Sequence, residues 1–236
     1  VKLFKSIEKT SGVFIDMKEL NKFEDTGWIK FDFDHRVAHW ANVANSKITS
    51  KLKNKTIFEN NLTCQGTWFV GVDALDNNPD GALGETPLSG PFENLMKSSE
   101  VCDLHSAQVS IIFEGYPKPR DQESQSSFNF RLKRDAAHVD GLIADFPGGP
   151  RKLKEPHAYV LGIPINQAPK GASPVVVWEG SHQLMAKAFE RFFLNRKSEE
   201  WGDLDVREVY SETRKSVFEK CKSCLLYTSD AADDAL

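Results

Sequence analysis

Apolar residues recur at helical spacing in three stretches of the chain. The first follows Asp34, a residue type suited to a helix N-cap, and its apolar positions return every three or four residues as far as Leu52. The second begins at Ser181, which can also cap a helix, and a third follows it. The apolar faces of these two consist of Met185, Ala188, Phe189, Phe192 and Phe193, and of Val209, Tyr210, Val217, Phe218 and Cys221. We therefore expect three amphipathic helices.

Five other stretches have the alternating or continuous apolar pattern of strands. They are residues 28–33, 67–72, 107–113, 158–165 and 174–178. Residues 76–81 and 167–173 are rich in turn formers, and residues up to about 99 suggest a long surface loop. The chain has no repeats and lacks the strand–helix alternation of a parallel sheet. The pattern predicts a mainly β fold with α additions, an antiparallel sandwich or jelly roll.

Composition narrows the class of protein. The 236 residues suffice for one domain, and 40% hydrophobic with 27% charged residues is typical of a globular chain. A net charge of −4 argues against a nucleic-acid partner, and no apolar run is long enough to cross a membrane. Four cysteines form no disulfide framework, so we expect a cytoplasmic protein. The oligomeric state is left open.

The C-terminal residues have an unusual sequence. Residues 224–234 resemble one translated reading frame of a transposon-end sequencing adapter. We therefore expect a single domain, incomplete at its C-terminus, over residues 1–223, and a foreign tail over residues 224–236. The C-x-x-C spacing of Cys221 and Cys224 then carries no redox or zinc chemistry, because its second cysteine lies in the tail.

The segment RDAAHVDG, residues 134–141, has the strongest chemical signal. In an extended segment, His138 and Asp140 point to the same side and can bind one metal ion. A second histidine would complete the two-histidine, one-carboxylate triad of non-haem Fe(II) oxygenases. The tripeptide alone is common, and a loop histidine beside a capping aspartate is the alternative interpretation.

The H-x-D segment is followed by a strand, a turn, a valine-rich strand and Glu179-Gly180-Ser181-His182. Ahead of it lie the Pro-Lys-Pro turn of residues 117–119 and the block TWFVGVDAL of residues 67–75. This order of motifs resembles the phytanoyl-CoA dioxygenase family, especially bacterial members with TWFVGVDAL and RDAAHVDG blocks. The resemblance covers about residues 107–185, with weaker support upstream. It implies a double-stranded β-helix, or jelly roll, that uses Fe(II) and the cosubstrate 2-oxoglutarate to hydroxylate a small organic or acyl substrate.

The resemblance also implies roles for individual residues. His138 and Asp140 become metal ligands, and Tyr116 lies where relatives contact the cosubstrate, although packing beside Pro117 is the alternative. Gln108 and Ser110 share one face of their strand, where they either line the pocket or bond to a neighbouring loop.

The family's second metal histidine and its 2-oxoglutarate-binding arginine lie further along the chain, the histidine in a His-Gly pair. Nothing between Gln183 and Ser223 matches them, so we expect both beyond Ser223 and little oxygenase activity from these residues alone. His182 is the less favoured third ligand, and we expect it to lie at the start of a helix beside the site.

Other candidates have a weaker basis. We expect Trp178 in the core and His157 at a strand edge, while His35, His39 and His105 show no partner pattern. A cluster of cations either faces an acidic substrate group or solvent: Arg151, Lys152 and Lys154. Gly162 replaces a tryptophan of some relatives. Two other functions stay open, a non-catalytic binding module and a hydrolase or isomerase that uses another metal ion.

Overall fold

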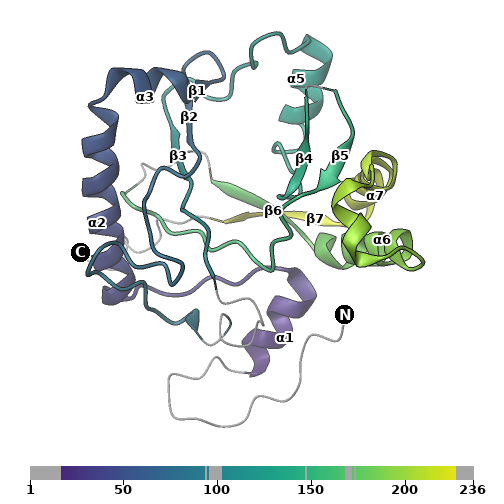
Figure 1. The fold of residues 1–236 in the computed structure, drawn as a ribbon, viewed down its shortest axis with the longest axis horizontal. Helices are drawn as coiled ribbons and strands as arrows, with labels where there is room; N and C mark the ends of the chain where they lie inside the picture. The colour runs from purple at the N-terminus through teal and green to yellow at the C-terminus, as the bar shows by residue number, and fades with distance from the viewer. Residues whose placement is uncertain are drawn as a thin grey trace.

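The computed structural model of the chain describes residues 17–93, 95, 103–146, 148–167, 172 and 174–226. Its N-terminal half contains helices α1 (Met17–Thr26), α2 (His35–Leu52) and α3 (Lys55–Asn60) and strands β1 (Leu62–Thr63), β2 (Trp68–Gly71) and β3 (Val109–Ile112). Helix α5 (Gln125–Leu132) and strands β4 (Leu142–Ala144), β5 (Arg151–Leu153) and β6 (Val175–Glu179) follow. The chain continues through helix α6 (Ser181–Phe193), the 3-10 helix η1 (Ser198–Asp203), helix α7 (Arg207–Lys220) and strand β7 (Lys222–Leu226) (Figure 1).

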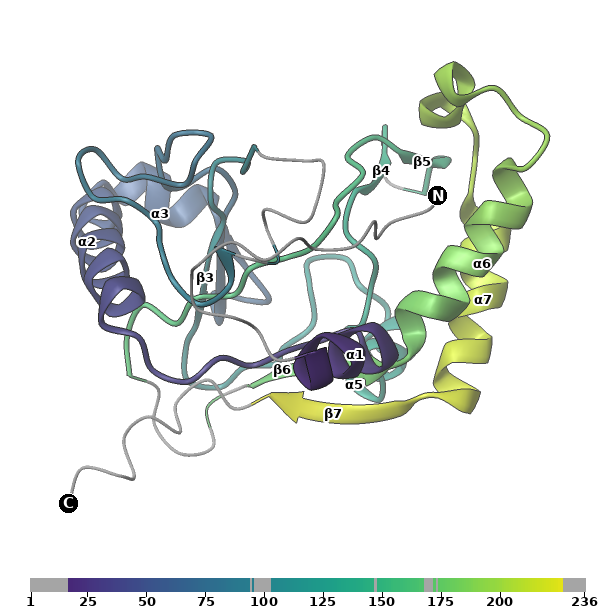
Figure 2. The same cartoon turned by 90° about the horizontal axis from the view of Figure 1, so that it is seen from below.

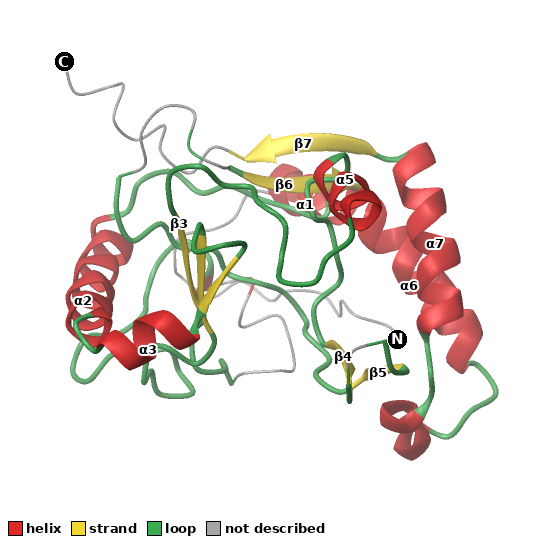
Figure 3. Ribbon diagram, turned by 90° about the horizontal axis from the view of Figure 1, so that it is seen from above, coloured by secondary structure: helices red, strands yellow, loops and turns green. Residues whose placement is uncertain are grey.

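All the strand pairs of the described residues are antiparallel. β1, β2 and β3 form one sheet in that order, while β4 pairs with β5 and β6 with β7. These small sheets lie among extensive loops (Figure 3). Antiparallel pairing agrees with the expectation from sequence, but the jelly roll itself stays a prediction.

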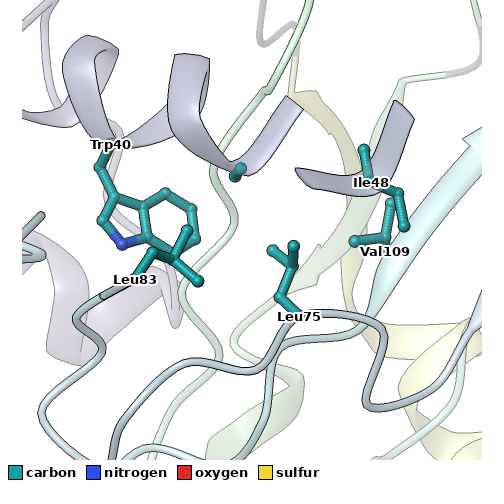
Figure 4. Packing of buried hydrophobic residues seen from close by; sticks show 6 residues of the cluster. Trp40, Ile48, Leu75, Leu83 and Val109 are labelled. Carbon is teal, nitrogen blue, oxygen red and sulfur yellow. The ribbon is translucent and has the colours of Figure 1, made fainter. Parts of the chain in front are cut away.

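Two hydrophobic clusters lie at opposite ends of the molecule (Figures 1 and 2). In the first, α2 packs against β3 and the loop after β2, with a core of Trp40, Ala44, Ile48, Leu75, Leu83 and Val109 (Figure 4). The second joins β4 to α6 and α7, with a core of Leu142, Met185, Phe193, Val206, Tyr210 and Val217. We call them the α2 core and the α7 core.

The three predicted helices are present as α2, α6 and α7. Asp34 caps α2 as expected, since its side chain accepts a hydrogen bond from the backbone amide of Arg36. The expected cap at Ser181 is wrong, because Ser181 is already the first residue of α6. The N-cap is Gly180, whose φ of 78° suits glycine, and no side chain caps this helix.

Two predicted strands are absent from the described fold. Residues 28–33 and 158–165 are assigned to neither helix nor strand, whereas the predictions for residues 67–72, 107–113 and 174–178 are met by β2, β3 and β6. An apolar pattern reports which side chains are buried, but a strand also needs a hydrogen-bonded neighbour. The predicted turn at residues 167–173 and the end of the long loop lie partly outside the described residues.

The described end of the chain pairs with β6. Cys224, Leu225 and Leu226 lie opposite Val177, Val176 and Val175 in the β6–β7 pair. Strand pairing uses backbone groups that every residue except proline possesses, so it does not separate native from foreign sequence. The described cysteines Cys64, Cys221 and Cys224 are free thiols. No helix of the described residues has the length and apolar character needed to cross a membrane.

Candidate metal centre

His138 and Asp140 lie in the loop between α5 and β4, rather than in a strand as the sequence suggested. The loop begins with a tight turn in which Ala136 N donates to Arg131 O over 3.0 Å. Asp135 and Ala136 both have left-handed conformations, with φ values of 51° and 54°. Such conformations are uncommon outside glycine, so the turn reflects a specific local constraint.

The two side chains nevertheless converge. His138 Nε2 lies 3.1 Å from Asp140 Oδ1, and His138 Nδ1 lies 2.9 Å from the carbonyl oxygen of Ala136. A carbonyl only accepts, so Nδ1 carries the proton and Nε2 of the neutral ring is left with its lone pair. Two ligands about 2.1 Å from one ion and at right angles to each other lie about 3.0 Å apart. The pair therefore fits two adjacent positions of an octahedral metal ion.

A hydrogen bond couples the pKa values of His138 and Asp140. The hydrogen bond to Asp140 is the main cause that raises the pKa of His138 above its ordinary 6.5, against desolvation and the charge of Arg120. The same hydrogen bond lowers the pKa of Asp140, and His157 adds to this effect. Without a metal, the pair is therefore favoured as imidazolium and carboxylate. A metal ion bound at Nε2 displaces that proton.

Neighbouring backbone holds this loop from both sides. Gly141 has a φ of 79°, and a Cβ at this position would overlap the carbonyl oxygen of Glu155. Its own carbonyl accepts hydrogen bonds from the amides of Lys154 and Glu155. On the other side, Arg214 of α7 donates from Nη2 to Ala137 O over 2.5 Å. Gly141 is thus required for close packing, and α7 holds the residue just before His138.

Two of the predicted cosubstrate residues, Ser110 and Tyr116, contact Trp68. Ser110 Oγ accepts from Trp68 Nε1 over 2.8 Å, and the Tyr116 ring meets the Trp68 ring edge-on at 6.0 Å. The Arg120 guanidinium lies 5.9 Å from the Trp68 ring, and its charge acts on both Tyr116 and His138. Burial raises the pKa of Tyr116. Gln108 is exposed just before β3. Arg120 was not recognised from the sequence, because its contact with Trp68 depends on long-range packing.

His182 lies against the end of α1. Its Nε2 is 2.8 Å from Glu24 O and therefore donates a proton to it, and Gln183 donates to the same oxygen over 3.0 Å. Gly27 leaves room for the ring, because a Cβ there would overlap His182 Nδ1. In this tautomer Nε2 is not free to bind a metal. Among the described residues, no third His, Cys, Asp or Glu donor joins His138 and Asp140 within 4.8 Å.

A second group of potential ligands was not recognised from the sequence. His105, Glu155 and His157 each bring one ligand atom within 4.8 Å of the others. His105 precedes β3, and the other two follow β5, so the contact depends on the fold. The spacing of Glu155 and His157, two residues apart like His138 and Asp140, was the only signal available.

The remaining candidates have structural contacts. Trp178 packs edge-on against Phe218 at 4.9 Å beside the α7 core, as expected from sequence. The three cations after β4 are largely paired: Arg151 donates to Leu142 O, Lys152 to Asp145 and Lys154 to Asp203. These contacts weaken the case for an acidic-substrate site at these cations.

The chain matches no protein-family model, no curated protein and no solved structure. The geometry of the loop and its contacts therefore carries the functional argument.

Proposed function

We propose that this chain carries two ligands of an Fe(II)- and 2-oxoglutarate-dependent dioxygenase centre. The observation that carries the proposal is the approach of His138 Nε2 to within 3.1 Å of Asp140 Oδ1, with Nδ1 held by Ala136 O. A neutral imidazole and a carboxylate at adjacent positions are two of the three ligands typical of non-haem Fe(II) oxygenases. The proposed protein is cytoplasmic and acts on a small organic or acyl substrate.

In this proposal the chain's own residues hold the metal ion and orient the cosubstrate. His138 and Asp140 would hold the iron, and Gly141 and Arg214 keep their loop in place. Tyr116, Ser110 and Gln108 would contact 2-oxoglutarate, whose negative charge Arg120 complements. The bound metal would supply the redox chemistry, in which a substrate C–H, O₂ and 2-oxoglutarate give a C–OH, succinate and CO₂.

Metal binding tests the proposal directly. The substitutions His105→Ala and His157→Ala first remove the second ligand group. This chain is then titrated with Co²⁺, with and without 2-oxoglutarate. We expect Co²⁺ to bind, to bind more tightly when 2-oxoglutarate is present, and to be lost in His138→Ala or Asp140→Asn. His39→Ala, on an exposed position of α2, is the matched control. Equal affinity with and without His138 would reject the site.

Exposure favours one alternative, a metal-binding module without catalysis. The side chains of His138 and Asp140 are 65% and 47% exposed, whereas oxygenation needs a site that excludes water. The hollow of about 300 Å³ between α6 and α7 is lined by neither residue. Succinate release from 2-oxoglutarate with Fe(II) and O₂ distinguishes the dioxygenase from the metal-binding module. Two ligands hold iron weakly, so we expect little or no succinate from this chain, and steady release would contradict that expectation.

A further inference from the structure

The structure assigns a second metal site to His105, Glu155 and His157, suited to Zn²⁺. The three ligand atoms lie within 4.8 Å of one another, and His157 Nε2 is 3.9 Å from Glu155 Oε2. The two imidazole rings are 5.5 Å apart and nearly perpendicular, at 78°. This site uses none of the residues of the proposed iron centre.

The ligand types favour zinc. Zn²⁺ prefers imidazole nitrogen and carboxylate oxygen, and three protein ligands plus water complete its tetrahedron. Ligand atoms about 2.0–2.1 Å from a tetrahedral ion lie roughly 3.3 Å apart. The separation is 3.9 Å between His157 and Glu155 and at most 4.8 Å between the other pairs, so side-chain rotations must bring the three ligands closer. His157 and Glu155 have room for this, since their side chains are 29% and 49% exposed.

The backbone on both sides of the site is already fixed. Asn77 binds the segment of His105 twice, because its Nδ2 donates to His105 O over 3.1 Å and its Oδ1 accepts from Ala107 N over 2.7 Å. On the other side, the amide of Glu155 donates to Gly141 O over 3.3 Å. Preorganised ligands lose less conformational entropy when the metal binds.

Charge around the site also suits a cation. Glu155 Oε2 lies 3.9 Å from Nε2 of His157, its fellow ligand in the proposed site. The neighbouring Lys154 is directed to Asp203, 3.4 Å away. The ammonium group closest in sequence thus has a carboxylate partner of its own.

A bound ion would connect the two halves of the molecule. His105 lies just before β3, whose Val109 belongs to the α2 core. Glu155 and His157 follow β5, whose Leu153 packs against the α7 core. An ion that joins these segments stabilises their contact by mass action, so the site would work as a structural clip.

Zinc titration of the whole chain tests the site. His138→Ala/Asp140→Asn provides a background without the first pair, and Zn²⁺ affinity is measured by competition with a chromophoric chelator. We expect one zinc per chain in this background and a rise in Tm with added zinc. Adding His105→Ala, His157→Ala or Glu155→Gln should weaken zinc binding by tenfold or more and remove the rise in Tm. His39→Ala in the same background is the control and should change neither.

Each result decides the proposal. A background chain that binds no zinc, or His105→Ala and His157→Ala variants that bind it unchanged, would overturn the site. Circular dichroism of the metal-free variants checks that they fold. If an alanine variant does not fold, Glu155→Gln still tests the site, because it preserves the shape of the side chain. The failure of this site leaves the iron proposal intact, because the two are measured in reciprocal backgrounds.

Discussion

At the scale of single residues, the hydrogen bond between His138 and Asp140 governs protonation of the candidate centre. It raises the pKa of His138 and lowers that of Asp140. Metal binding removes the proton from Nε2, so metal affinity should increase as pH rises and level off only above the raised pKa of His138. In acid, both ligands are protonated and affinity is lost.

Asp140→Asn tests this coupling in the metal-free chain. The amide keeps the shape but removes the negative charge, so we expect the pKa of His138 to fall towards or below 6.5. The measurement is an NMR titration of the imidazole Cε1 proton. Asp145→Asn, whose carboxylate pairs with Lys152, is the control and should leave the His138 titration in place. An unchanged pKa in Asp140→Asn would show that the two side chains do not interact in solution.

Gly141 is the residue whose substitution should affect the loop most. Gly141→Ala combines a positive φ with overlap of the Glu155 carbonyl, so we expect a loss of about 3 kcal/mol in the free energy of unfolding and weaker metal binding. Urea denaturation and Co²⁺ titration measure the two effects.

Gly66→Ala separates the two causes. Gly66 has the same φ of 79°, but nothing lies within 4 Å of its Cβ position, so only the conformational cost of about 1 kcal/mol remains. If both substitutions cost the same, the close contact between Gly141 and Glu155 is not present in solution.

The sequence predicted the first candidate ligand pair but missed the second candidate group. His138 and Asp140 are two positions apart, so a local rule was enough to place them together, although the segment is a loop and not a strand. His105 meets His157 only because the segment before β3 packs beside the segment after β5. No periodicity within either segment reports such a contact.

At the scale of elements, α7 supports the candidate centre through Arg214. Its Nη2 donates to Ala137 O, and its guanidinium lies near the rings of Phe130 and Phe218. Arg134 of the loop stacks on Phe130 at 3.9 Å and lies 5.1 Å from Phe218. Two arginines and two aromatic rings thus connect the end of α5 to α7, next to His138.

Arg214→Met should loosen the loop without removing a ligand. The methionine retains apolar contact with the rings but leaves the Ala137 carbonyl without its donor, so we expect metal affinity at His138 to fall about tenfold. Lys215→Met, at an exposed neighbouring position, makes the same change in charge. Co²⁺ titration compares the two variants. Equal losses would assign the effect to net charge and not to the hydrogen bond.

Helices with one apolar face were predictable from the sequence. An apolar pattern predicted a strand correctly only where the fold supplies a neighbouring strand. The apolar faces predicted α2, α6 and α7, but α5 has the polar sequence QSSFNFRL with no buried residue and gave no periodic signal. Residues 158–165 are rich in strand-forming side chains, yet Ile163 and Ile165 pack against the α2 core without entering a sheet. Side-chain burial and strand pairing are separate requirements.

At the scale of the whole molecule, two cores of buried hydrophobic residues lie at opposite ends of the described structure. Figure 2 shows α2 at one end and α6 with α7 at the other. Ile48 is 2% exposed in the α2 core and Leu142 is 6% exposed in the α7 core. Separate cores can open separately, in which case stability differs between the two halves.

We therefore expect matched core substitutions to act locally. Ile48→Ala should accelerate amide exchange in α2 and β3 more than in α6 and α7, and Leu142→Ala should do the reverse. Each substitution should cost its own core about 2–5 kcal/mol, because it removes a buried aliphatic side chain. Hydrogen exchange followed by mass spectrometry of peptides from both halves, without added metal, provides the measurement. Equal acceleration in both halves by either variant would show that the two cores unfold as one cooperative unit even without a metal ion.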